Sequence, residues 1–376
     1  MKTIIKNGKV ILPDFKSFSE SNLLIEDDRI VGFCDSEKAD KVIDAKGKYI
    51  LPGLIDIHTH GSSGGIYAST KNIEDALIYS AKAGVTSVAA TIGNFPMDHL
   101  ISYIQNVVCY AKKQSEGANI AGIHLEGPFI SMEKKGAMQP PSIEATVENF
   151  NKLIDAGEGL VRVMTIAPER ENALEIIKEG KKRGVRMSIG HTVASVKETE
   201  AAIMAGATGA THTFNAMKSL LHRDPGVLGG VLTSPEVTCE VICDFVHLAP
   251  ATVKLIYLAK GVDGMILISD SGPQTGLPDG EYSFGGFIKV VKDGMCVLKG
   301  TTTISGSVRP ISYGAKNLLK LGIPINEVSQ MGSYNPAKAL GIDSDVGSIE
   351  EGKRADIIIV DGEFNVECVL VRGEEI

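Results

Sequence analysis

The first fifty residues alternate short apolar runs with turn-forming pairs. An Asn7-Gly8 pair interrupts the run TIIKNGKVIL, and Asp27 and Asp28 interrupt NLLIEDDRIVGF in the same way. Apolar runs joined by such a pair are typical of hairpins. No amphipathic helix fits before Pro52, so we expect only short strands and turns in this part of the chain.

From Gly53 the pattern changes to short apolar, β-branched runs that alternate with helical stretches. The eight runs are LIDIH, VTSVAAT, NIAGIHLE, LVRVMTIAP, VRMSIGH, ATGATHT, VTCEVIC and MILISD. Such a series predicts an α/β fold, a closed (β/α)8 TIM-like barrel. We expect the third helix near 144–156. The sixth unit, ATGATHT, is the weakest, because a long loop with Gly and Pro follows it in place of a clean helix.

The C-terminal part of the chain returns to strands. A Gly-rich insert follows Asp270, its middle alternates like a hairpin, and helices are expected near 310–321 and 335–340. The tail after Gly347 resembles the first fifty residues in its strands and turns. We therefore expect residues 1–50 and 341–376 to form a small β-sandwich domain from both termini, and residues 51–340 to form the barrel.

Composition and charge exclude several classes of protein. The 376 residues are 43% hydrophobic and 22% charged, which is ordinary globular usage. A net charge of −8 does not suit a nucleic-acid partner. No apolar run approaches the roughly 20 residues of a membrane helix, and the N-terminus has no signal-peptide core. Six scattered cysteines without a CxxC favour buried thiols over a zinc ribbon or disulfides. We expect a cytoplasmic protein with no membrane partner.

Ligand-type side chains stand where the barrel strands end. On a strand, residues two apart face the same side, so Asp56, His58 and His60 should point together. Four more candidates close later strands: Glu126, His191, His212 and Asp270. Barrel enzymes keep their active sites at this end of the strands. Imidazole and carboxylate without thiolate suit Zn²⁺ or Fe²⁺. Any one of these residues alone is more often structural, but the whole set predicts a metal-dependent catalytic barrel.

Motifs along the chain narrow the interpretation. They are LPGLIDIHTHG at 51–61, HLEGPF at 124–129, GHT at 190–192, THTFNAM at 211–217 and GSIEEGKRAD at 347–356. Together they resemble the N-acetylglucosamine-6-phosphate deacetylases of the amidohydrolase superfamily, over essentially the whole chain. The resemblance implies hydrolysis of N-acetyl-D-glucosamine 6-phosphate to D-glucosamine 6-phosphate and acetate by a metal-activated water in amino-sugar catabolism.

The resemblance also implies roles residue by residue. Glu126, His191 and His212 match the main metal ligands. His58 and His60 match a second metal position, so one or two divalent ions per chain, zinc or iron, are implied. Asp270 matches the general base and acid. Five further positions match those that hold the phosphorylated amino sugar, namely Ala137, Asn215, Ala216, Arg223 and His247. A homodimer is implied, with Arg223 or His247 reaching in from the neighbouring subunit.

Two departures from the family pattern leave the substrate open. The turn Lys135–Pro140 reads KGAMQP, with Met138 and Gln139 near the position where many members carry a histidine that polarises the amide carbonyl. Phe245 stands in the stretch before His247, where the family usually has glycine. Alternatives are therefore a deacylase of N-acetylgalactosamine 6-phosphate or of a non-sugar amide. A non-catalytic barrel is the alternative from another class, but it usually shows eroded ligands, and here all of them survive.

The other histidines rank low as site residues. His99 lies at the start of a polar helix and His222 beside Arg223 in a loop, and we expect both to be solvated. His124 shares a strand face with Glu126, so it either lines the barrel or orients a ligand.

Overall fold

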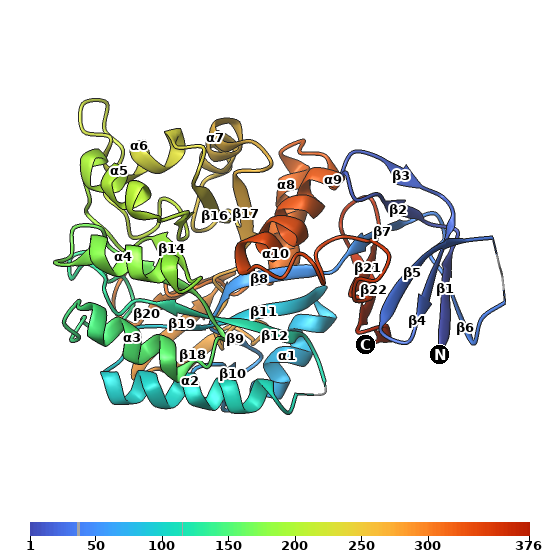
Figure 1. The fold of residues 1–376 in the computed structure, drawn as a ribbon, viewed down its shortest axis with the longest axis horizontal. Coiled ribbons are helices and arrows are strands. Elements are labelled where there is room, and N and C mark those ends of the chain that lie inside the picture. The colour runs from blue at the N-terminus through green and yellow to red at the C-terminus, as the bar shows by residue number, and fades with distance from the viewer. Residues whose placement is uncertain (36–37, 115) are drawn as a thin grey trace.

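The largest part of this computed structural model, which describes residues 1–35, 38–114 and 116–376, is a parallel barrel (Figure 1). Its eight described strands neighbour one another in chain order. They are β8 (Leu54–Thr59), β11 (Val85–Ile92), β12 (Asn119–Glu126), β13 (Val161–Ile166), β14 (Arg186–Ile189), β15 (Gly209–Ala210), β16 (Thr238–Ile242) and β17 (Met265–Ile268). The predicted (β/α)8 fold is confirmed.

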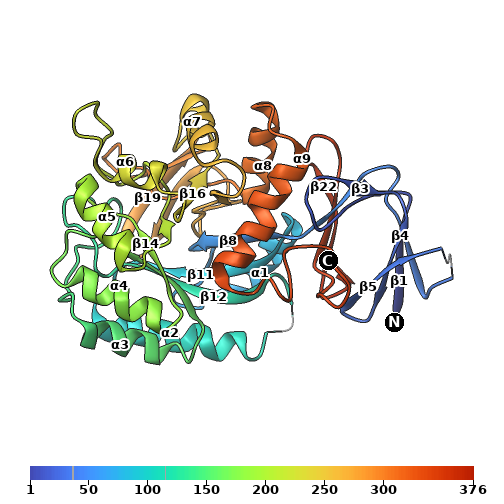
Figure 2. The same cartoon turned by 45° about the horizontal axis from the view of Figure 1, so that its top comes forward.

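Helices pack around the outside of these strands (Figure 2). In chain order they are α1 (Ile73–Lys82), α2 (Met97–Ala111), α3 (Val147–Ala156), α4 (Ala173–Lys182), α5 (Val196–Ala205), α6 (Gly226–Thr233), α7 (Pro250–Lys260) and α8 (Ile311–Lys320). Both β8 and β11 are buried at every position, as expected for parallel strands that are covered on both faces. In the described part of the chain, no helix combines the length and the apolar character that a membrane span requires.

Two barrel units differ from their predictions. A helix, α6, does follow the sixth strand, after a long loop, so the prediction of a loop without a clean helix is wrong. The sixth strand itself has only two residues, and the chain adopts a left-handed conformation at His212. Helix α3 begins at Val147 rather than near residue 144, because the Thr146 side chain caps it by accepting a hydrogen bond from the amide of Asn149.

Both chain termini lie in two smaller sheets at one end of the barrel (Figure 1). One sheet holds β5 (Arg29–Cys34), β4 (Asn22–Glu26), β1 (Lys2–Lys6) and β6 (Lys41–Asp44). The other holds β23 (Glu374–Glu375), β22 (Val366–Val371), β21 (Ile357–Val360), β7 (Tyr49–Pro52), β2 (Lys9–Ile11) and β3 (Phe18–Ser19). The terminal segments thus form a sheet-rich domain. The boundaries 1–50 and 341–376 stay a prediction, and residue 50 falls inside β7.

The segment between β17 and α8 forms a separate three-stranded sheet. Its strands are β18 (Gly280–Phe284), β19 (Phe287–Lys292) and β20 (Met295–Leu298). A two-stranded hairpin, β9 (Gly61–Ser62) and β10 (Gly65–Ile66), follows the first barrel strand. Beyond α8, the chain forms α9 (Ile325–Ser329), a π-helical turn (Gln330–Tyr334) and α10 (Asn335–Leu340).

The barrel closes where its first and last strands end. The amide of Asp270 donates to the carbonyl of His58 at 2.9 Å, and the amide of His60 donates to the carbonyl of Ser271 at 2.7 Å. These bonds continue the parallel pairing past the end of β17. They bring residues more than 200 positions apart in the chain side by side, so Asp270 stands next to both histidines.

Gly53 joins β7 to β8, and a side chain at this position would overlap the buried side chain of Thr86. We expect Gly53→Ala to lower the free energy of unfolding by about 1–3 kcal/mol, because an added methyl group overpacks this junction. Thermal or urea unfolding measures the change. Gly362→Ala is the control, since nothing lies within 4 Å of the added atom there. Equal stability of the two variants would contradict the expectation.

Candidate active site

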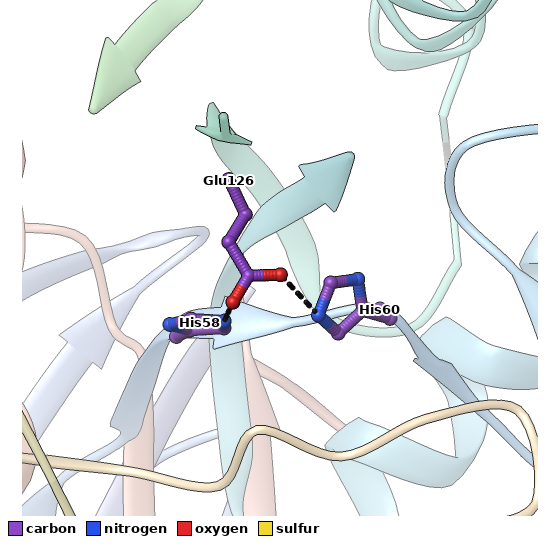
Figure 3. A group of neighbouring side chains, drawn as sticks. All are labelled: His58, His60 and Glu126. Carbon is purple, nitrogen blue, oxygen red and sulfur yellow. Dashed lines mark ion pairs between the residues drawn. The ribbon is translucent and has the colours of Figure 1, made fainter. Parts of the chain in front are cut away.

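The carboxylate of Glu126, at the end of β12, is surrounded by imidazoles. Figure 3 shows two of them, one at each oxygen. His58 Nε2 lies 3.3 Å from Oε1, and His60 Nε2 lies 3.2 Å from Oε2. Both histidines come from the end of the first barrel strand. Glu126 is only 4% exposed, so its charge must be balanced by neighbouring groups rather than by water.

Two further imidazoles reach the same carboxylate from the fifth and sixth strands. The Nε2 atoms of His191 and His212 each lie 3.0 Å from Glu126 Oε1 and 3.0 Å from each other. His191 Nδ1 donates to the backbone carbonyl of Lys134 at 2.6 Å, so its Nε2 carries the lone pair. Three ring nitrogens, those of His58, His191 and His212, therefore converge on Oε1, while His60 alone approaches Oε2.

These residues fit one or two divalent cations. The ligand atoms of His58, His60 and Glu126 lie within 4.8 Å of one another, and so do those of Glu126, His191 and His212. His58 Nε2 is buried and has no hydrogen-bond partner among the described residues. Nitrogen and oxygen ligands without thiolate suit zinc or iron(II). The structure thus brings together all five residues that the sequence predicts as ligands.

Asp270 follows β17 and faces this cluster. Its Oδ1 lies 3.5 Å from His58 Nε2 and 3.4 Å from His60 Nε2. Burial opposes ionisation of this carboxyl group, but the neighbouring imidazoles of His58 and His60 outweigh burial, so the pKa of Asp270 is lowered. Because the carboxylate form dominates near neutral pH, Asp270 can accept a proton from a water beside the cluster.

Several site residues have a strained backbone. His191, His212 and Asp270 have φ angles of 49°, 28° and 50°, and Ala216 has a φ of 49°. Residues other than glycine rarely adopt this left-handed conformation, which costs on the order of 1–3 kcal/mol. Three of these four, His191, His212 and Asp270, stand two positions past the end of a barrel strand and contact the cluster. Such outliers gather at functional sites.

The cluster forms the floor of a cavity of about 500 Å³. Nine of the eleven predicted site residues line it: His60, Glu126, Ala137, His191, His212, Asn215, Ala216, His247 and Asp270. His58 lies beneath them, with no exposed surface. Arg223 is exposed in the loop before α6 and does not line the cavity of its own chain.

His247 enters the cavity with a carboxylate behind it. Its Nδ1 donates to Asp244 Oδ2 at 2.8 Å, and Ser307 Oγ donates to the same oxygen at 2.9 Å. Burial alone would lower the pKa of His247, but the Asp244 carboxylate outweighs burial and raises it. The imidazole is therefore protonated up to a higher pH than usual and presents a positive charge to an anion in the cavity.

Both departures from the family pattern lie near the cavity, with different consequences. Met138 and Gln139 line it, and the Gln139 side chain lies beside Gly286 of the insert. Phe245 packs against the hydrophobic core and does not line the cavity. Phe245 was expected to influence substrate choice, but its side chain is not among those that would contact a substrate in the cavity.

Of the remaining predictions, the one for Asp56 is wrong and those for His99 and His222 are confirmed. Asp56 does not point with His58 and His60, because the pairing of β8 with β11 shifts register here and Asp56 accepts a hydrogen bond from Ser269. Burial raises the pKa of Asp56 to about 6. His99 and His222 are exposed, as predicted.

His124 is fully buried, and neither of its ring nitrogens faces the cluster. They bond the Ile57 carbonyl at 3.2 Å and the Thr165 hydroxyl at 2.8 Å. Burial lowers the pKa of His124 to about 3, so the ring is neutral. The question left open by the sequence is thereby resolved: His124 packs inside the barrel, its ring 4.6 Å from that of His58.

Sequence reasoning missed the residues that the insert contributes. Phe284, Phe287 and Lys289 line the cavity. On β19, Ile288 is 49% exposed while Lys289 is turned inward, which reverses the usual apolar-inward pattern. A lysine that alternates with apolar residues on the inner face of a hairpin strand is the sequence pattern that could have identified Lys289 as a cavity residue. Asp244 and Glu240, which contact His247 and His58, were also missed.

Known proteins with similar sequences and structures identify the family to which this barrel and its residue cluster belong. A family model described as the amidohydrolase family matches residues 49–376. This chain belongs to the amidohydrolase family. The N-acetylglucosamine-6-phosphate deacetylase of Bacillus subtilis (strain 168) is 36% identical over 331 residues, which cover 86% of this amidohydrolase and 83% of that protein. The N-acetylgalactosamine-6-phosphate deacetylase of Escherichia coli O157:H7 is 31% identical over 338 residues, 89% of each protein.

A solved structure agrees over the whole amidohydrolase chain. It is a mutant N-acetyl-D-glucosamine-6-phosphate deacetylase from Mycobacterium smegmatis in complex with N-acetyl-D-glucosamine-6-phosphate. Its TM-score is 0.91 at 31% identity, and the match covers 100% of this chain and 98% of that one. The predicted resemblance to this group of amidohydrolases is confirmed.

Asp270→Asn should keep the bound metal but lower kcat by about 10²-fold or more, because the amide cannot accept a proton from water. Steady-state kinetics measures the loss, and elemental analysis of the same sample checks that metal is retained. Turnover near that of the wild type, with metal retained, would remove Asp270 from the mechanism.

Proposed function

We propose that this amidohydrolase releases acetate from a 6-phosphorylated N-acetylhexosamine, with N-acetyl-D-glucosamine 6-phosphate as the first candidate. The observation that carries the proposal is the position of Asp270 beside an imidazole–carboxylate cluster, in a cavity that also contains His247 paired with the Asp244 carboxylate. The relatives named above act on substrates of this kind. Amino-sugar catabolism is the context that their names support.

The reaction is an amide hydrolysis in which the residues have distinct roles. Water adds to the acetyl carbon while Asp270 takes its proton. The carbon–nitrogen bond then breaks as the protonated Asp270 returns the proton to the nitrogen, and acetate and a free amine leave. When bound, a divalent cation would polarise the carbonyl and lower the pKa of the attacking water. Glu126 and the four histidines would hold it, and Phe284 and Phe287 of the insert line the same cavity.

We propose two cations per chain at full loading, zinc or iron(II), with Glu126 between them. Both pairs of histidines approach Glu126, one pair at Oε1 alone and the other at both oxygens. A carboxylate with histidines on both sides can bridge two metal ions. With two cations, all four histidines and Glu126 would serve as metal ligands.

We also propose that the enzyme acts as a cytoplasmic homodimer. Arg223 is exposed on the loop before α6 and does not line the cavity of its own chain. Its planar guanidinium suits phosphate and can reach the cavity of a second copy. The exposed apolar residues Leu220, Leu221 and Leu258 are available for the same contact. Buried thiols at Cys239 and Cys243 suit a reducing compartment.

N-acetylgalactosamine 6-phosphate is the second candidate, favoured by the Escherichia coli relative. Acetate release from both sugars, each with and without the 6-phosphate, tests the proposal. We expect one phosphorylated sugar to react with kcat/KM at least about 10²-fold above its unphosphorylated form, because removing one partner of a buried charged pair typically costs several kcal/mol. Acetate release independent of the phosphate would contradict the proposal and favour a non-sugar amide.

Asp244→Asn should shift the pH dependence of KM. In the wild type, Asp244 raises the pKa of His247, so binding of the phosphate dianion is strong below that pKa and weakens as pH rises through it. Without the carboxylate the pKa falls, so KM should begin to rise at a lower pH than in the wild type and exceed the wild-type KM by up to about tenfold between the two pKa values, with kcat little changed.

Ser307→Ala is the matched control for this change, because it removes a hydrogen bond to Asp244 but leaves the carboxylate in place. KM measured from about pH 6 to pH 9 should follow the wild-type curve in this variant. If KM of Asp244→Asn also follows that curve, His247 does not hold the phosphate by charge.

A further inference from the structure

A carboxylate that the proposed reaction does not use lies inside the barrel beneath the cluster. Glu240 stands in the middle of β16, between the apolar residues Cys239 and Val241, and has no exposed surface. Its Oε2 lies 3.3 Å from Nδ1 of His58. Its Oε1 has no hydrogen-bond partner among the described residues.

Glu240 is not explained by stability alone. Removing a carboxylate from water costs several kcal/mol, and the hydrogen bond to His58 together with the charge of Arg186 nearby only partly offsets this cost. An apolar side chain of similar size in such a position often leaves a protein equally stable or more stable. The neighbours of Glu240 on β16, Cys239 and Val241, are apolar. The charge therefore points to a role toward His58.

The hydrogen bond between Glu240 and His58 determines which ring nitrogen of His58 can bind a cation. A carboxylate only accepts hydrogen bonds, so Nδ1 carries the proton that Glu240 accepts. Nε2 then presents its lone pair on the opposite side of the ring, 3.3 Å from Glu126 Oε1 and 3.5 Å from Asp270 Oδ1. The carbonyl of Lys134 acts on His191 in the same way, but without a charge.

We propose that Glu240 is a positioning residue that holds Nε2 of His58 toward the cation between His58, His60 and Glu126, and so sets the affinity of that position. The inference rests on the two-cation centre under Proposed function. Partners that accept the second ring proton of a metal-bound histidine fix its orientation and raise its basicity, and their loss typically lowers metal affinity about 10–100-fold.

Another reading of the same residues is a separate cation site. The ligand atoms of His58, His124 and Glu240 also lie within 4.8 Å of one another. Both nitrogens of His124 are already bonded, to the Ile57 carbonyl and the Thr165 hydroxyl. His124 therefore has no lone pair free for a cation, and Glu240 is left with His58 as its partner.

Zinc retention tests the proposal without relying on activity. Zinc-loaded protein is equilibrated at graded free Zn²⁺ concentrations, and elemental analysis gives the zinc bound per chain. The wild type should lose two equivalents in separate steps. In Glu240→Leu the weaker step should move to about 10–100-fold higher free Zn²⁺, with the tighter step unchanged. Glu240→Gln should give a smaller shift, because its amide oxygen still accepts the Nδ1 proton.

Two controls separate positioning from folding. Asp356→Asn removes a buried carboxylate from a different network, where it binds Arg354, and should leave both steps in place. In a His58→Gln background, Glu240→Gln should have no further effect. Wild-type retention in both Glu240 variants would overturn the proposal, and so would an equal shift of both steps. A single equivalent of zinc bound at saturation in the wild type would instead overturn the two-cation centre on which the proposal rests.

Discussion

The buried carboxylate of Glu126 is the group around which the site is organised. Four imidazole nitrogens lie 3.0–3.3 Å from its two oxygens, and Asp270 adds a second negative charge to the same space. Charges of this kind are stable away from water only when they are closely paired. The four histidines around Glu126 supply that pairing, and they are the groups that would hold the divalent metal of this family at the same point.

The barrel makes this convergence possible. Parallel strands end at one face, so side chains far apart in the chain meet there when the sheet closes. Closure is completed by the backbone bonds that join His58 and His60 to Asp270 and Ser271. His191, His212 and Asp270, which meet there, share the left-handed backbone conformation that non-glycine residues rarely adopt. The insert between β17 and α8 covers the face and narrows the cavity.

Local patterns were sufficient for the barrel and for the inner part of the site. Each buried strand is an apolar run, and each proposed ligand closes such a run, so periodicity alone located them. The same patterns failed where tertiary contacts decide. The register shift beside Asp56 turns its side chain to Ser269, and α6 forms from a Gly-rich segment that packing stabilises. Glu240, Asp244 and Lys289 act through neighbours distant in the chain, which spacing cannot reveal.

The central claim is that Glu126 joins two cation positions. Anomalous diffraction from zinc-loaded crystals, measured on both sides of the zinc absorption edge, tests it most directly. The account predicts two peaks that flank the Glu126 carboxylate, one against His191 and His212 and the other against His58 and His60. A single peak at full loading, with His58 and His60 bound only to Glu126 and Asp270, would contradict the claim.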